Sequence, residues 1–277
     1  MTYRTAAFTL LAAIALPAIA GEASGEFKTT GRDPIRPKFA AAYETRDQRD
    51  PRKRIVEVVL SDAPVDAAAA AADLDPHMNV INQPALMDHN YILLWVRPDN
   101  DVSMNATYGA RMVQFVDMTG SMGSLQAEMK TSTANHVEGR VWSTKAVKTD
   151  NGTWTVDVRF STDVAHAPAG TRLPADGGEP GKAFKALLAA RSAKKLDAIQ
   201  KNVVKPFDSL DDALSTLDIW LPKKGAKITG GELRADSAVL EVEGEMFPGM
   251  KGLYLVAMKK SGGRWLFDRA VRGGMLD

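Results

Sequence analysis

The side chains of the first half of the chain that are best suited to metal chemistry lie in one short segment. HMNVINQPALMDH, residues 77–89, contains His77, Met78, Met87 and His89. Imidazole and thioether groups are ligands that copper accepts. We expect this segment to form a loop. The spacing of these residues matches no metal motif, and methionine also fills apolar cores, so we predict no metal site. The alternative is a copper site, for which these four residues would be the ligands.

The second half of the chain offers a different set of polar groups. Residues 180–277 contain no histidine, and their candidates for proton transfer in a pocket are Asp218, Tyr254 and Asp268. Glu241, Glu243 and Glu245 alternate with small or apolar residues, which indicates the solvated face of a strand and not a catalytic cluster. Aromatic residues in a helix or strand either line a pocket or fill a core. The predicted ligand contacts are Trp220, Tyr254 and Trp265.

Several classes of site are excluded by motifs that are missing from the sequence. The chain contains no cysteine, so it has no disulfides, no thiolate metal ligands and no cysteine nucleophile. It also lacks GxGxxG after a strand, GxxxxGK[ST], GxSxG and HExxH. We therefore predict no nucleotide site and no cofactor.

The N-terminus has the layout of a secretory signal peptide. MTYRTAAFTLLAAIALPAIA, residues 1–20, has an early cation at Arg4, then an apolar stretch, then Ala18-Ile19-Ala20 before Gly21. The apolar stretch is short for a bilayer span and contains Pro17. This pattern predicts a periplasmic or secreted protein without an integral membrane segment after processing.

The charges of the chain are divided unevenly between its two parts. Residues 21–166 contain 16 Lys and Arg against 20 Asp and Glu, whereas residues 167–277 contain 18 against 14. Neither imbalance is large enough to indicate nucleic acid or an anionic membrane as a partner. We expect the two parts to attract each other.

Residues 39–166 have the pattern of a β domain. Short segments such as RMVQFVDM and TWTVDVRFS alternate apolar with polar residues, and turn signals such as Asn151-Gly152 separate them. The pattern predicts an antiparallel β-sandwich of immunoglobulin-like shape. The preceding residues 21–38 are predicted to form an irregular arm, and the charge run at 44–54 to form a solvated loop.

The spacing of apolar residues changes from strand-like to helix-like after residue 179, which predicts a second domain at residues 180–277. The segment 167–179 is rich in proline and glycine, which is typical of a linker. Helical spacing follows in three segments, the last capped by Ser209, and four strand-like segments complete the chain. The order predicts an α+β domain of three helices followed by a four-stranded antiparallel sheet.

The second domain resembles the nuclear transport factor 2 superfamily, which includes SnoaL-like and ketosteroid-isomerase-like domains. The resemblance rests on the element order, on AFKALLAARSAKKLDAI and on the final hairpin GLYLVAMKK…RWLFDRA. It implies a curved sheet wrapped around helices in a cone with an apolar pocket, and dimerisation through the sheet. The first domain resembles sandwich domains of uncharacterised exported bacterial proteins, which implies no activity.

These observations favour an exported, non-enzymatic protein that acts by binding or scaffolding. The ligand would be another envelope protein, a peptide or a small apolar molecule. One alternative is an enzyme of the SnoaL or ketosteroid-isomerase type that uses the cone pocket. Another is periplasmic copper handling by the segment around His77 and His89. A desolvated carboxylate in a deep cavity would favour chemistry, whereas a filled cone would favour binding.

Overall fold

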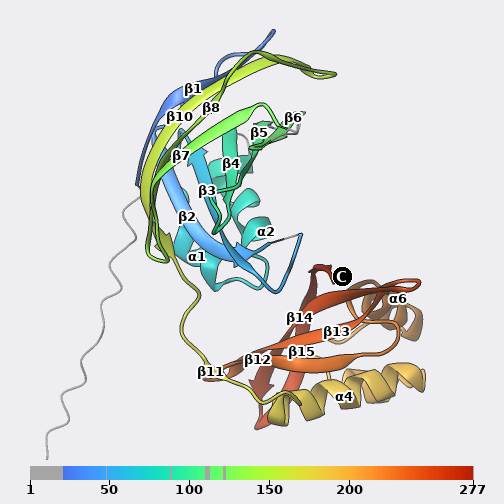
Figure 1. Ribbon diagram of the computed structural model, residues 1–277. Helices are drawn as coiled ribbons and strands as arrows, with labels where there is room; N and C mark the ends of the chain where they lie inside the picture. The colour runs from blue at the N-terminus through green and yellow to red at the C-terminus, as the bar shows by residue number, and fades with distance from the viewer. Residues whose placement is uncertain (1–20, 48, 88, 110–112, 121–122, 277) are drawn as a thin grey trace, which may run out of the picture.

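The protein folds into two domains joined by a short connection (Figure 1). The structure, a computed structural model, describes residues 21–276 except 48, 88, 110–112 and 121–122. The predicted signal peptide, residues 1–20, lies outside the described residues. Strands contain 50% of the described residues and helices 19%, so the β-rich character predicted from the sequence is confirmed.

The first domain contains one strongly curled sheet and not the predicted two-sheet sandwich. The order of hydrogen-bonded strands is β6-β5-β4-β3-β2-β1-β10-β8-β7, with β9 paired to β10. The strands are β1 (Gly21–Thr29), β2 (Phe39–Arg46), β3 (Arg54–Ser61), β4 (Tyr91–Val96), β5 (Val102–Tyr108), β6 (Val113–Met118), β7 (Leu125–Ser132), β8 (His136–Ser143), β9 (Val147–Thr149) and β10 (Gly152–Ala165). A sandwich and a curled sheet give the same alternation along each strand, so the alternation does not distinguish them.

The N-terminal segment is a strand of this sheet, although its sequence predicts an irregular arm. β1 pairs with β10 from Glu22↔Ser161 to Thr29↔Trp154 and also contacts β2. Its composition is polar and contains two glycines because the backbone approaches β10 closely. Gly25 has φ 98°, and a Cβ atom there would lie 2.1 Å from the carbonyl oxygen of Asp157.

Replacing Gly25 with alanine is therefore expected to destabilise the first domain by about 3 kcal/mol, because the methyl group combines backbone strain with a steric overlap. Gly31 is a matched control, since its φ of 75° is also positive but no atom lies within 4 Å of its Cβ position. Gly31→Ala should cost only about 1 kcal/mol. Urea unfolding of both variants tests this, and equal losses would contradict the close approach of β1 to β10.

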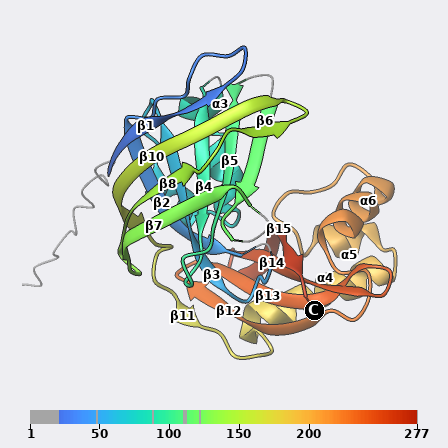
Figure 2. The same ribbon diagram turned by 45° about the horizontal axis from the view of Figure 1, so that its top comes forward.

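The curled sheet encloses an apolar core on its concave side and is covered by helices on part of its other face. Phe27, Phe115 and Trp154 are central to the enclosed core. The helices are α1 (Ala67–Ala72), α2 (Pro76–Ile81) and α3 (Pro84–Met87), and they pack on β2, β3 and β4. In Figure 2 the strands β1, β10, β8 and β7 curve over β3, β4 and β5. The segment at 77–89, predicted to be a loop, is thus largely helical, because Asp75 caps α2 and Pro76 and Pro84 open helices.

The second domain packs helices against one face of an antiparallel sheet. Its sheet has five strands in the order β11-β12-β13-β14-β15, so the predicted layout of three helices followed by a four-stranded sheet is wrong. The additional strand, β11, precedes the helices, and the described part of the chain has six helices in all. The elements are β11 (Thr171–Arg172), α4 (Gly178–Ser192), α5 (Leu196–Gln200), α6 (Leu210–Trp220), β12 (Lys227–Arg234), β13 (Ser237–Phe247), β14 (Met250–Ser261) and β15 (Arg264–Met275).

Side chains fill the space between the helices and the sheet of the second domain. Phe184, Leu217, Leu240, Tyr254 and Phe267 are buried in this core. The opposite face of the sheet is turned toward the first domain, so that β12–β15 lie between α4 and the curled sheet (Figure 1). No helix in the described ranges is both long and apolar enough to cross a bilayer.

Candidate functional site

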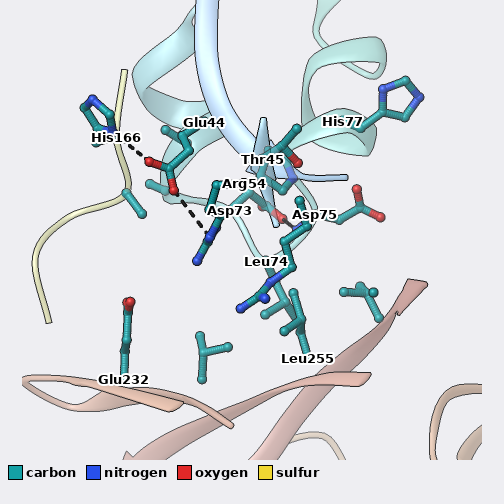
Figure 3. Close-up of a pocket in the computed structure, with 18 of the residues that line it drawn as sticks. Glu44, Thr45, Arg54, Asp73, Leu74, Asp75, His77, His166, Glu232 and Leu255 are labelled. Carbon is teal, nitrogen blue, oxygen red and sulfur yellow. Dashed lines mark hydrogen bonds and ion pairs between the residues drawn. The ribbon is translucent and has the colours of Figure 1, made fainter. Parts of the chain in front are cut away.

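A pocket of about 520 Å³ lies between the two domains. One wall is formed by β2, β3 and the segment from α1 to α2, and the opposite wall by β12–β15. The connection at 166–170 forms one end. Figure 3 shows Glu44, Arg54, Asp73 and Asp75 on the first wall, with Glu232 and Leu255 facing them from the second sheet.

Three ion pairs hold the two walls together. Arg46 pairs with Glu241, Arg52 with Glu243 at 3.1 Å, and Asp73 with Arg269 at 2.9 Å. In the first two pairs the arginine belongs to the first part of the chain, which is acidic overall, and the glutamate belongs to the second part, which is basic overall. The attraction between the domains therefore depends on local charges and not on the net charge of each part.

Glu241 and Glu243 consequently lie on an interdomain face and are not freely solvated. Their side chains are 34% and 26% exposed. The same face of the sheet is the one through which the resemblance predicts dimerisation, and here it faces the first domain. The segment at 44–54, predicted as a solvated loop, supplies much of the opposing wall, and its two ends belong to β2 and β3.

Glu44 is the centre of a small network at one end of the pocket. Its two carboxylate oxygens lie 3.3 Å from Arg54 Nε and 3.2 Å from His166 Nδ1 (Figure 3). Desolvation and the neighbouring Arg46 lower the pKa of Arg54, although Glu44 opposes this effect. A guanidinium in such surroundings gains free energy from a further negative group.

The pocket also contains N–H groups that no described residue accepts. The two terminal nitrogens of Arg54 form no hydrogen bond within the described part of the chain, and this side chain is 47% exposed. The Nε of Arg234 is buried and also has no acceptor among the described residues. The carboxylates on the walls, in contrast, are engaged: Glu232 accepts from Arg234, and Asp73 from Arg269 and Asn79. The arrangement offers hydrogen-bond donors to a ligand that carries acceptors.

A second cluster, built on three neighbouring strands, lies deeper in the first wall. Tyr43, Glu57 and Trp95 are opposite one another in the registers of β2, β3 and β4. Glu57 is 1% exposed; its Oε2 accepts from Trp95 Nε1 at 3.0 Å, and its Oε1 lies 2.7 Å from Nδ1 of His77 on α2. Burial and the Glu57 carboxylate raise the pKa of Tyr43, whose hydroxyl has no hydrogen-bond partner among the described residues.

His77 is thereby fixed in one orientation at the rim of the pocket. Burial disfavours its charged form, but the hydrogen bond and the charge of Glu57 prevail and raise the pKa of His77 above 6.5. Because Nδ1 is held by Glu57, Nε2 is the ring nitrogen left for other contacts. The hydrogen bond to Glu57 therefore favours the protonated form of His77.

The raised pKa of His77 predicts a pH dependence of stability. The native state binds this proton more tightly than the unfolded state, so the contribution is complete below 6.5 and is lost as the pH rises through the native pKa. We expect the melting temperature of the wild-type chain to fall over this range relative to His77→Gln. Parallel pH profiles of the two chains would contradict a protonated His77–Glu57 pair.

The four residues of the copper hypothesis are not brought together. His77 pairs with Glu57, whereas His89 Nδ1 lies 3.0 Å from Asp62. Met78 and Met87 are 45% and 60% exposed. Within the described residues no group of three or more His, Asp or Glu side chains is arranged to hold a metal ion.

The polar candidates of the second domain are also separated. Tyr254 is 1% exposed and donates its hydroxyl to the Glu245 carbonyl at 3.1 Å, within the apolar core. The Asp218 side chain is 55% exposed and lies 3.8 Å from Arg191. Asp268 is partly buried on β15.

The two tryptophans expected to line a pocket or a core have different surroundings. Trp265 packs partly against the core of the second domain and lies under Lys260, whose Nζ is 5.9 Å from the ring centroid. Trp220, at the end of α6, is 43% exposed. It therefore lies outside the core in which Phe267 is buried.

The residues that sequence reasoning missed are Arg54 and Glu57. Arg54 lies in a charge run, where solvation is the simplest interpretation. Glu57 interrupts the apolar run IVEVVLS in a strand that is buried on both faces. A lone carboxylate in such a strand requires a partner, and this signal was available in the sequence.

Comparisons with family models, with characterised proteins and with solved structures gave no match to this chain.

Proposed function

We propose that the protein is a non-enzymatic binding protein whose small ligand occupies the pocket between the two domains. The observation that carries this proposal is the accessible guanidinium of Arg54, whose terminal nitrogens bond to no described residue, on the wall of a pocket of about 520 Å³. Pockets of this size hold small organic molecules, and they occur preferentially between domains.

The lining favours a polar, acidic ligand over an apolar one. Aliphatic surface comes mainly from Leu74, Val239 and Leu255, whereas arginine and histidine side chains supply the free donors. A carboxylate of the ligand would accept from the terminal nitrogens of Arg54, which is the geometry that a guanidinium favours. The remaining polar atoms of the ligand would meet the partly exposed side chains of His77 and His166.

The second domain supports a binding role by having a filled interior. We propose that it is related to the nuclear transport factor 2 superfamily, since its helices pack against one face of an antiparallel sheet. Tyr254 and Phe267 are buried between the helices and the sheet, where the resemblance implies a pocket. In this proposal the other face of the sheet forms a wall of the ligand pocket. Homodimerisation through the same face would be an alternative to this role.

We place this binding activity outside the cytoplasm. The support comes from the signal-peptide pattern at residues 1–20. The ligand would then be a small acidic molecule, or the end of a peptide, that is present in the envelope or the surrounding medium.

The proposal is tested by thermal shift with a panel of small anions: succinate, citrate, glutamate and inorganic phosphate at millimolar concentration. A ligand that binds only the native state raises the melting temperature by mass action. We expect at least one carboxylate to raise it, and the shift to disappear in Arg54→Gln. Lys53→Gln is the matched control, because Lys53 is the neighbouring exposed cation and pairs with Asp50.

Two outcomes would contradict the proposal. The first is a panel in which no compound shifts the wild-type melting temperature. The second is a shift of equal size in wild type, Lys53→Gln and Arg54→Gln, because such a shift would come from an effect unrelated to Arg54.

A second candidate function is acid–base chemistry in the same pocket, and the His77–Glu57 pair is the observation that favours it. A buried carboxylate that fixes the tautomer of a histidine is a common arrangement for proton transfer. In this case a substrate would be turned over and would not remain bound. A bound compound recovered unchanged after incubation favours the binding function, and conversion that is lost in His77→Gln favours the enzyme.

A further inference from the structure

Large apolar side chains gather on the surface at one end of the second sheet. The structure exposes nine large hydrophobic side chains in its described ranges, and five of them belong to this region. They are Ile219, Trp220, Phe247, Met250 and Met275, with exposed fractions from 43% to 51%. Single exposed apolar residues are common, but a group of this kind usually marks an interaction surface.

The members of the group are joined by specific contacts. Phe247 pairs with Met250 across the turn between β13 and β14. Arg272 donates to the carbonyl of Ile219 at 2.7 Å, and its guanidinium lies 5.6 Å from the centroid of the Phe247 ring. The end of α6 is thus held beside the β13–β14 turn, and the four side chains Ile219, Trp220, Phe247 and Met250 form one patch, which we call the end patch.

Three lysines surround the end patch among the described residues. Lys223, Lys224 and Lys251 are exposed beside it. The backbone of residues 223 and 224 is bonded to Glu245, which fixes these lysines near the turn. Of the described carboxylates near the patch, Asp218 lies 3.8 Å from Arg191, and Glu245 accepts from the Gly249 amide at 3.2 Å.

We propose that the end patch docks the protein onto the surface of a bilayer that contains anionic lipids. Tryptophan and phenylalanine at an exposed helix end and turn are suited to the interface between headgroups and acyl chains. The three lysines would remain at headgroup level and attract anionic lipid. Three exposed lysines beside the apolar side chains suit an anionic surface better than a purely apolar partner.

Docking of this kind needs no rearrangement of the fold. Phe247 and Met250 are on a tight turn with Gly249 at φ 78°, and no atom lies within 4 Å of the Gly249 Cβ position. The apolar side chains therefore project from the domain in its native conformation. The proposal is independent of the ligand pocket, since none of the four end-patch side chains lines it.

The test is co-sedimentation with vesicles, using a chain that starts at Gly21. This chain contains every described element of the fold but lacks the apolar residues 1–20, which would bind vesicles by themselves. We expect binding to vesicles of phosphatidylglycerol and phosphatidylcholine in equal parts, little binding to pure phosphatidylcholine, and a blue shift of tryptophan fluorescence on binding. High salt should weaken the binding because the lysine contribution is screened.

Two sets of variants assign the binding to the end patch. Phe247→Ser with Met250→Ser should lower the partition coefficient about tenfold or more, and so should Lys223→Gln with Lys224→Gln and Lys251→Gln. Met78→Ser with Met87→Ser is the matched control, because these methionines are equally exposed on the first domain. All substituted side chains are exposed, so the fold should persist, and circular dichroism checks this.

Three results would overturn the proposal. One is binding to neither type of vesicle. Another is binding that the end-patch variants leave unchanged. The third is a concentration-dependent dimer in sedimentation velocity that Phe247→Ser with Met250→Ser abolishes while vesicle binding is absent, which would identify a second copy of the chain as the occupant.

Discussion

Replacing Phe27 with alanine should lower the free energy of unfolding of the first domain by about 3–5 kcal/mol. Phe27 is fully buried, and its ring lies 5.5 Å from Trp154 and 5.4 Å from Phe115 between ring centroids. The substitution removes these contacts and leaves a cavity in the enclosed core. It would affect β1 and β10 together, because Phe27 pairs with Val156 across the two strands.

Phe247→Ala is the matched control, since this phenylalanine is 45% exposed. Its loss should cost less than about 1 kcal/mol. Urea unfolding followed by circular dichroism measures both variants. If Phe27→Ala costs no more than Phe247→Ala, then residues 21–29 do not form an integral strand, and the curled sheet described above is wrong in its centre.

The second large effect is expected for Glu57→Ala, at about 2–3 kcal/mol. Removing this buried carboxylate leaves the indole N–H of Trp95 and the imidazole of His77, both only partly exposed, without their acceptor. The helix α2 would also lose its polar contact with β3. Glu57→Gln should cost less, because the amide oxygen still accepts from Trp95.

Asp62→Ala provides the comparison for Glu57→Ala. Asp62 forms the same type of pair with His89, but the two side chains are 50% and 43% exposed. An exposed ion pair of this kind contributes less than about 1 kcal/mol. Thermal unfolding of both variants at pH 6 measures the two losses of stability. Equal losses would show that Glu57 is not a buried acceptor.

The type of many elements could be predicted from the sequence, whereas their arrangement could not. The alternation in segments such as TWTVDVRFS predicts strands, and β10 covers that segment. Whether strands belong to two packed sheets or to one curled sheet depends on which edges pair. The pairing of β1 with β10 joins residues more than a hundred positions apart, and local periodicity contains no information about it.

The candidate site was the least predictable feature because it lies between domains. Arg46 and Arg52 are part of a charged run that resembles any solvated loop, and only the position of Glu241 and Glu243 on the facing sheet gives them partners. The sequence predicts that Trp220 lines a pocket or fills a core, and it is instead exposed. Its helical spacing matches that of Leu217, but α6 ends at Trp220, and the side chain is 43% exposed.

The central claim, that a small acidic ligand occupies the pocket beside Arg54, is tested most directly by native mass spectrometry. The protein is purified without denaturation from the cells that produce it, as wild type, Lys53→Gln and Arg54→Gln. We predict an additional bound mass of a small organic acid on the wild type and on Lys53→Gln, and its loss from Arg54→Gln. A wild-type protein that carries no bound mass and gains none from the carboxylate panel, or an Arg54→Gln variant that retains the ligand fully, would contradict the account.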